Sequence, residues 1–216
     1  MKLVVVGGGE HARVVIDAAR TRADLWEISG YVDLHRNSET ESRFNLSYLG
    51  TDREGLALAS SDDVRFVLGL AGLRAREARR KLATVYGEAG ARWASVVHTD
   101  ARVSSSARVE DGAFVNSGAI INTGAVVEPH AVINTGAVVE HDVVVGAFAQ
   151  ISPAAAIGGG SRVGRDAYVG LGARIRDHVE IGGGAIIGMG AVVVQTVPAN
   201  EQVVGHPAKP GETKQS

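Results

Sequence analysis

The chain of 216 residues contains no cysteine, which excludes disulfides, a thiolate nucleophile and zinc sites built on cysteine. It has no uninterrupted apolar run of about 18 residues, and its start, MKLVVVGGGEH, turns to glycine too soon for a signal peptide. No membrane span is therefore predicted, and the cytoplasm is the expected compartment. Charge of either sign is not in excess, since 22 basic and 24 acidic residues leave a net charge of −2. The chain therefore has no excess of positive charge that would indicate binding to nucleic acid or to an anionic membrane.

A six-residue repeat occupies almost half of the chain. Every sixth residue from Val97 to Val193 is Val or Ile, and most of these are followed four positions later by Ala, with Ser161 as a polar exception. A period of six fits neither an α-helix nor a long strand, but it fits a short strand followed by a tight turn. Three such sides make one coil, and neighbouring coils would lie about 4.8 Å apart. Both the large and the small residue should point inward, so both columns are expected to be buried.

This hexapeptide pattern, over residues 97–197, resembles the left-handed parallel β-helix acyltransferases, whose repeats bury their apolar sides by stacking. The resemblance implies an all-β left-handed β-helix domain with a C-terminal tail, over residues 93–216. It also implies a homotrimer with acetyl-CoA as co-substrate, bound along the groove between neighbouring β-helices, and no metal. Where relatives often have a donor-binding histidine this chain has Gln150, which excludes acid or base chemistry there. By resemblance, the other donor-binding residues are Leu171, Gly188, Met189, Gly205 and Lys209.

The first part of the chain has a different pattern. Residues 3–6 are an apolar run typical of a buried parallel strand, Gly7–Gly9 follow, and His11–Arg22 carry apolar residues at helical spacing. The alternation of strands and helices continues at residues 28–32, 64–70 and about 74–85. This alternation predicts a small parallel α/β domain of Rossmann-like type over residues 1–92.

The glycine turn of this domain offers backbone N–H groups at a helix N-terminus, where the helix dipole favours a phosphate. Asp33 follows the second strand, where a dinucleotide-binding fold places an acid on ribose. However, Ala12 stands where the G-x-G-x-x-G fingerprint has its last glycine, which argues against NAD. The glycines alone are equally consistent with a tight connection that binds nothing.

A narrower resemblance rests on GGGEHARVV and the later GYVD. These segments resemble the sialic acid O-acetyltransferase and the bacillosamine and perosamine N-acetyltransferase group. In those N-acetyltransferases the N-terminal domain holds the nucleotide-sugar. The resemblance implies that Gly7, Gly9 and His11 meet the diphosphate and that Asp33 meets the base or the ribose. Relatives usually have Gly where this chain has Glu10, so either Glu10 points away from the diphosphate or the ligand differs.

The histidines of the repeat region lie on different sides of the predicted β-helix. His141 and Asp142 follow the inward Val139, which puts them in an exposed turn, and Gly159 lies one coil further on the same edge. His178 lies on this side two coils away, whereas His98 and His130 belong to the other two sides. An exposed histidine is by default a solvated surface residue. The resemblance implies instead that His141 is the general base, with Asp142 as its orienting partner. In such a reaction the N–H of Gly159 is the natural oxyanion donor, and no acyl-enzyme is needed.

These observations favour an acetyl-CoA-dependent N-acetyltransferase that acts on the amino group of a nucleotide-linked 4-amino-4,6-dideoxy sugar. O-acetylation of sialic acid or another sugar is the main alternative, and the sequence does not separate UDP, GDP and dTDP. A γ-class carbonic-anhydrase-like zinc enzyme would need three converging histidines, but His98, His130 and His141 lie on different sides. A non-catalytic trimerising module that binds a nucleotide-sugar is the third alternative.

Overall fold

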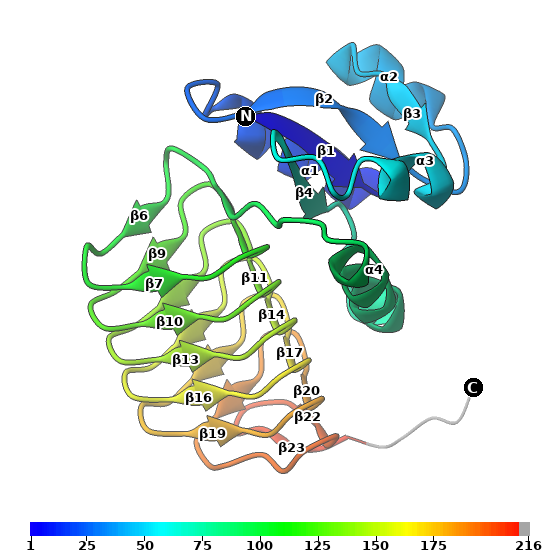
Figure 1. Ribbon diagram of the computed structural model, residues 1–216. Coiled ribbons are helices and arrows are strands. Elements are labelled where there is room, and N and C mark those ends of the chain that lie inside the picture. The colour runs from blue at the N-terminus through cyan, green and yellow to red at the C-terminus, as the bar shows by residue number, and fades with distance from the viewer. Residues whose placement is uncertain (212–216) are drawn as a thin grey trace. The chain divides into compact units, whose positions relative to one another are not determined.

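The protein was analysed as a computed structural model that describes residues 1–211 (Figure 1). It divides into two compact units, Met1–Thr99 and the chain from Asp100 onward. The sequence suggests a division slightly earlier, after residue 92. Each unit has its own type of sheet and its own core, and they are described in turn.

The first unit is built on a parallel four-stranded sheet in the order β3-β2-β1-β4, which is the Rossmann-like arrangement expected from the sequence. Its strands are β1 (Lys2–Val6), β2 (Glu27–Val32), β3 (Tyr48–Gly50) and β4 (Val64–Leu68), and β5 (Val96–Val97) comes near its end. Its helices are α1 (Glu10–Arg20), α2 (Ser38–Phe44), α3 (Asp52–Ala57), the 3₁₀ turn η1 (Leu73–Ala75) and α4 (Arg76–Glu88). The residues Leu3–Val6 of β1 are fully buried, as the apolar run predicts for a central parallel strand.

The second unit is a left-handed parallel β-helix, which confirms the predicted fold class. Its two-residue strands pair in parallel with partners 18 residues away, for example Val138 with Ala156 and Val144 with Arg162. Figure 1 shows the stacked coils. The β12 face consists of β6 (Arg102–Val103), β9 (Ile120–Ile121), β12 (Val138–Val139), β15 (Ala156–Ile157), β18 (Arg174–Ile175) and β21 (Val192–Val193). The β13 face consists of β7 (Arg108–Val109), β10 (Val126–Val127), β13 (Val144–Val145), β16 (Arg162–Val163) and β19 (Glu180–Ile181). The β14 face contains β8 (Phe114–Val115), β11 (Val132–Ile133), β14 (Gln150–Ile151), β17 (Tyr168–Val169), β20 (Ile186–Ile187), β22 (Gln202–Val204) and the antiparallel β23 (Lys209–Pro210).

The core of the β-helix follows the six-residue repeat, with one correction. The inward Val and Ile side chains from Val115 to Val193 are buried. The expectation that both columns are buried throughout is wrong for the first coil, because Val103 is 37% exposed. Its strand β6 pairs with β9 on one side only, so one side of Val103 has no coil to cover it. Ser161 fits the small-residue column because its Oγ donates to Arg176 O at 3.0 Å and accepts from Val179 N at 3.1 Å.

The turns from Gly112 to Gly190 share one backbone feature. Their third residue has a positive φ, and glycine fills this position in many coils, as in Gly124 and Gly160 with φ of 68° and 66°. Asp142 and His178 hold the same conformation at φ of 58° and 54°. A side chain in this conformation costs about 1 kcal/mol relative to glycine. The edge that joins the β12 face to the β13 face therefore carries two such residues, and this edge is called the His141 edge below.

Candidate active site

His141 and Asp142 lie in the turn after β12 and contact each other. His141 Nδ1 and Asp142 Oδ2 are 3.0 Å apart, and both side chains are exposed. This hydrogen bond holds the ring with Nδ1 toward the carboxylate, so Nε2 is the nitrogen that can accept a proton from a substrate. Glu140, which precedes the pair, is itself held by Asn122, whose Nδ2 donates to Glu140 Oε2 at 3.0 Å.

The imidazole of His141 lies over Gly159 of the next coil. A Cβ on Gly159 would come within 2.4 Å of His141 Nε2. The two coils are also joined by their backbones, because Gly160 N donates to His141 O at 2.9 Å. Only glycine therefore fits beneath the ring in this position, and Nε2 faces the Gly159 backbone.

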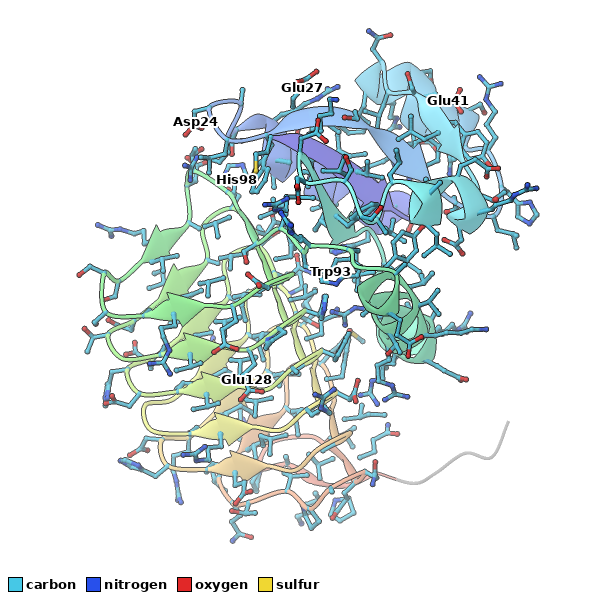
Figure 2. All side chains as sticks on the ribbon, viewed as in Figure 1. Asp24, Glu27, Glu41, Trp93, His98 and Glu128 are labelled. Carbon is cyan, nitrogen blue, oxygen red and sulfur yellow. The ribbon has the colours of Figure 1, made fainter. Side chains whose placement is uncertain are left out.

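The N–H of Gly159 is available because the preceding residue has no side chain. In the turns that begin with asparagine, that first residue caps the next N–H: Asn116 accepts from Ser117 N at 2.8 Å, and Asn122 accepts from Thr123 N at 3.0 Å. A carboxylate from another coil can do the same, as Glu128 does for Ala147 N at 2.9 Å (Figure 2). Gly158 offers no cap, and within residues 1–211 the N–H of Gly159 donates no hydrogen bond. A free donor thus lies directly beside the candidate base.

A second imidazole packs on the same glycine turn from the other side. A Cβ on Gly160 would lie 2.5 Å from His178 Nδ1, and His178 N donates to Gly159 O at 2.9 Å. The sequence places His178 two coils from His141, but both rings fold toward the coil between them. His130 lies elsewhere, with its ring stacked on Phe148 at a centroid distance of 4.8 Å.

In the first unit, the glycine turn is held by its neighbours. Gly8 N donates to Asp33 Oδ2 at 2.6 Å, and Thr40 Oγ1 donates to Gly8 O at 2.7 Å. A Cβ on Gly8 would overlap the Tyr31 ring, and Gly7 has a φ of 109°. Asp33 therefore binds the turn itself, and a ligand would share its carboxylate with Gly8. Thr40, which is fully buried, is a contributor that the sequence did not point to.

The N-terminus of α1 follows this turn and is open. Gly9 is the N-cap without a side-chain hydrogen bond, and a Cβ there would meet nothing within 4 Å. Glu10 points away, with its side chain 96% exposed and its carboxylate 4.0 Å from Arg13. These features leave room for an anion at the start of the helix.

His11, the second residue of α1, is largely buried. Burial, followed by the positive charge of Arg79, lowers the pKa of His11 to about 4. His11 is therefore neutral at pH 7 and would meet a diphosphate as a hydrogen-bond donor rather than as a cation. Arg79 of α4 is only 2% exposed and supplies the positive charge in this region. The sequence indicated a basic helix at this place but not that one of its arginines points inward.

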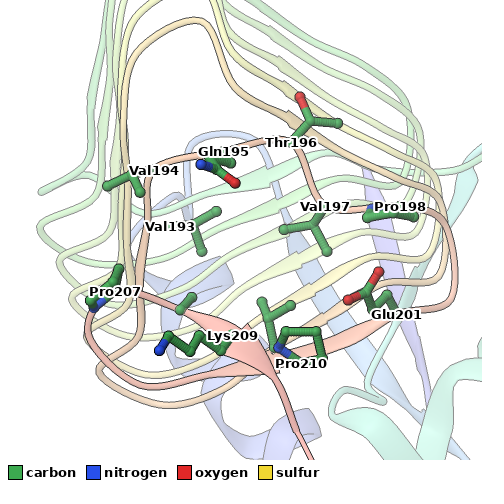
Figure 3. A pocket seen from close by; sticks show the side chains of 12 residues that line it. Val193, Val194, Gln195, Thr196, Val197, Pro198, Glu201, Pro207, Lys209 and Pro210 are labelled. Carbon is green, nitrogen blue, oxygen red and sulfur yellow. The ribbon is translucent and has the colours of Figure 1, made fainter.

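The expected donor-binding residues lie away from the His141 edge. Leu171 and Met189, 52% and 77% exposed, are in the turns that lead from the β14 face to the β12 face. Gly188 is in the same turn as Met189, and these turns are called the Leu171 edge below. Gln150 lies on the β14 face and is buried. Lys209 lines a hollow of about 370 Å³ at the C-terminal end of the β-helix, together with Val193, Pro198 and Pro207, and Gly205 lies shortly before it in the chain (Figure 3).

No group of three or more His, Asp or Glu side chains within residues 1–211 is arranged to hold a metal ion. None of the helices within this range has the length and apolar character needed to cross a membrane.

Known proteins resemble this chain in sequence and in fold. Residues 2–83 match the family model of the PglD N-terminal domain. The structure is similar to that of GDP-perosamine N-acetyltransferase from Caulobacter crescentus in complex with CoA and GDP-perosamine, a variant with one histidine replaced by alanine. That match has 32% identity and a TM-score of 0.88, and it covers 98% of this chain and 97% of the other. No curated protein matches the chain.

A second solved structure gives the same result. The acetyltransferase domain of PglB from Neisseria gonorrhoeae FA1090, in complex with acetyl coenzyme A, is 31% identical with a TM-score of 0.89. That match covers 97% of this chain and 98% of the other. Both resemblances inferred from the sequence are confirmed. The chain belongs to the hexapeptide-repeat acetyltransferases, in the group of the perosamine N-acetyltransferase and the PglB acetyltransferase domain.

Proposed function

We propose that this protein transfers the acetyl group of acetyl-CoA to the amino group of a nucleotide-linked 4-amino-4,6-dideoxy sugar. The observation that carries the proposal is the convergence of His141 Nε2, its partner Asp142 and the free N–H of Gly159 on one edge. Relatives that share about a third of the sequence over almost the whole chain bind CoA and GDP-perosamine, or acetyl coenzyme A. The cytoplasm, where acetyl-CoA and nucleotide-sugars are available, is the expected compartment.

The chemistry requires few groups. The amine nitrogen attacks the thioester carbonyl carbon, and His141 Nε2 accepts the proton that the nitrogen loses. Asp142 stabilises the imidazolium that forms. The carbonyl oxygen becomes an oxyanion and accepts a hydrogen bond from Gly159 N–H. When the C–N bond is complete the C–S bond breaks, and the proton returns from His141 to the CoA thiolate.

The donor site is proposed to lie between chains of a homotrimer. The Leu171 edge and the His141 edge are different edges of one β-helix. A donor lying along Leu171, Gly188 and Met189 is therefore proposed to meet the base of a neighbouring copy. Gln150, Gly205 and Lys209 are assigned to the same donor site by the family resemblance. Exposed Leu171 and Met189 would then be covered by the donor and the adjacent subunit.

The acceptor nucleotide is assigned to the domain formed by residues 1–92, and acetyl transfer to residues 93–216. Gly7 and Gly9, with the open N-terminus of α1, suit a diphosphate, and His11 can donate one hydrogen bond to it. Asp33 is assigned to the base or ribose, through the lone pairs that Gly8 leaves free.

A thiol-release assay tests this function. Acetyl-CoA is supplied with UDP-, GDP- and dTDP-linked 4-amino-4,6-dideoxy sugars and, separately, with sialic acid. We expect CoA release with at least one amino sugar and a product that is stable to hydroxylamine, as an amide is. A hydroxylamine-labile ester would establish O-acetylation instead, and release with none of the acceptors would contradict the proposal. Sedimentation of the protein at micromolar concentration tests the trimer, and a monomer would contradict it.

A further inference from the structure

Three hydroxyl groups form a cluster on the His141 edge, on the N-terminal side of the candidate base. Thr123 lies one coil from His141, and Ser104 and Ser106 lie two coils from it. Ser104 Oγ, Ser106 Oγ and Thr123 Oγ1 are mutually within 3.0–3.3 Å. The cluster is tied to the catalytic turn, because Asp142 N donates to Thr123 O at 2.9 Å. Ser106 and Thr123 are exposed, so a ligand on this edge can reach them.

Counting donors and acceptors shows where the cluster can take a further partner. Each hydroxyl has one donor and two acceptor sites. Ser106 N donates to Ser104 Oγ at 3.4 Å and Gly124 N donates to Ser106 Oγ at 3.2 Å, which occupy one acceptor site on each serine. No backbone N–H of the described residues donates to Thr123 Oγ1. When each hydroxyl of the cluster donates to one of the other two, Thr123 Oγ1 keeps one acceptor site for a hydroxyl from outside the cluster.

A hollow adjoins the cluster. It has a volume of about 490 Å³, and Ser104 is the member of the cluster that lines it. The rest of its lining is Ala101, Arg102, Val103, Ile120, Ile121 and Asn122. Apolar walls with a few polar groups at the rim are typical of sites that hold small molecules. A pyranose with one apolar side and several hydroxyls has the matching character.

We propose that Ser106 and Thr123 bind the hydroxyl on the sugar carbon next to the amine-bearing carbon of the acceptor. This inference rests on the proposed function. Thr123 stands 18 residues before His141, in the same turn position, so the two are one coil apart, about 4.8 Å. Because His141 Nε2 faces Gly159, a sugar ring that extends from the amine toward the N-terminal coils would bring its neighbouring hydroxyl toward Thr123. The two residues are specificity-determining for the acceptor and take no part in proton transfer.

The test uses a double variant that carries both Ser106→Ala and Thr123→Val. Its control is Ser105→Ala, at a neighbouring serine for which the structure shows no side-chain hydrogen bond. We expect the double variant to raise the KM for the nucleotide-sugar about 3-fold to 10-fold per lost hydroxyl, with the KM for acetyl-CoA unchanged. Ser105→Ala should behave as the unmodified enzyme. Thr123→Ser, which keeps the hydroxyl, should retain the original KM, and all variants should have the same Tm.

An acceptor analogue that lacks the hydroxyl next to the amine-bearing carbon makes the test specific. The unmodified enzyme should bind this analogue worse than the parent sugar, whereas the double variant should bind both equally. The inference is overturned if the double variant keeps its preference for the parent sugar, or if only the KM for acetyl-CoA rises. If the unmodified enzyme acetylates no amino sugar, the proposed function fails, and this inference fails with it.

Discussion

Two turns of the β-helix have the same sequence, Gly-Gly-Gly, but they differ in their surroundings. Gly158–Gly160 and Gly182–Gly184 both end in a glycine of positive φ, 66° and 70°. At Gly159 a Cβ would lie 2.4 Å from the His141 imidazole, whereas at Gly183 it would meet only the carbonyl of Arg165 at 3.3 Å. The chemistry of a turn is thus decided by the side chain 18 residues earlier. Glycine at Gly158 and Gly159 leaves the N–H without a cap and makes space, and the neighbouring coil supplies the imidazole of His141.

Replacing His141 should remove the imidazole that distinguishes the turn Gly158–Gly160 from the turn Gly182–Gly184. We expect His141→Asn to lower kcat by about 10²-fold to 10⁴-fold with little change in either KM, because a general base is lost while binding is kept. Steady-state kinetics with both substrates measures this. Full activity in His141→Asn would end the assignment, and an equal loss in His178→Asn alone would transfer it to that histidine.

A methyl group added at the middle glycine of each turn tests whether the space beneath His141 matters for catalysis. Gly159→Ala should lower kcat about 10-fold to 10²-fold, because the new Cβ must push the imidazole out of its position. Gly183→Ala is the matched control in the same kind of turn and should leave kcat nearly unchanged. Circular dichroism checks that both variants fold. Equal losses in the two variants would mean that Gly159 acts only as a turn residue.

Replacing Asp142 shows whether this residue lowers the stability of the turn while it supports catalysis. Asp142 holds a positive φ where the coils on either side have Gly124 and Gly160. Asp142→Gly should therefore keep or raise Tm while kcat falls about 10-fold, since the imidazole remains but its partner is gone. Thermal unfolding and initial rates measure both quantities. A lower Tm with unchanged kcat would show a structural role for the carboxylate.

The third glycine turn, Gly7–Gly9, extends the comparison to the first unit. Gly9 has open space at its Cβ position, so Gly9→Val should fold and raise the KM for the nucleotide-sugar about 10-fold, with the KM for acetyl-CoA unchanged. Gly8→Ala should instead lower Tm, because its Cβ would overlap the Tyr31 ring. Equal effects of Gly9→Val on both KM values would contradict the role assigned to this domain.

The smallest expected effect concerns His11. Its pKa of about 4 in the folded protein lies below the value of about 6.5 in an unfolded chain, so the unfolded chain binds more protons between these values. The free energy of unfolding should therefore fall as pH falls, by about 1 kcal/mol between pH 7 and 5.5 from this residue. Urea unfolding should show this slope reduced in His11→Gln but not in His35→Gln, which changes an exposed histidine. An identical slope in all three proteins would contradict the burial of His11.

The sequence predicted the elements that a strict repeat or a long apolar run defines. The coils and their faces follow from the column of Val and Ile, and β1 follows from its apolar run. The elements α2, β3 and α3 were not predicted, because they are short and depend on local caps such as Asn37 and the Thr51–Glu54 capping box. The exposure of Val103 was missed because a periodic pattern does not say where the stack of coils ends.

The sequence predicted only those contacts of the candidate site that follow from the spacing of residues along the chain. The distance of 18 residues places Gly159 next to His141, and adjacency in sequence brings Asp142 to it. Spacing does not give the rotamers that turn His178 toward Gly160 or Asp33 toward Gly8. The free N–H of Gly159 also required the hydrogen bonds of the other turns for comparison.

The most direct test of the central claim is a crystal structure of the His141→Asn variant with acetyl-CoA and a nucleotide-linked amino sugar that it acetylates too slowly to turn over. We expect the acetyl carbonyl oxygen about 3 Å from Gly159 N and the amine nitrogen within hydrogen-bond distance of residue 141. An acetyl group bound at Gly183, or an amine directed away from residue 141, would contradict the account.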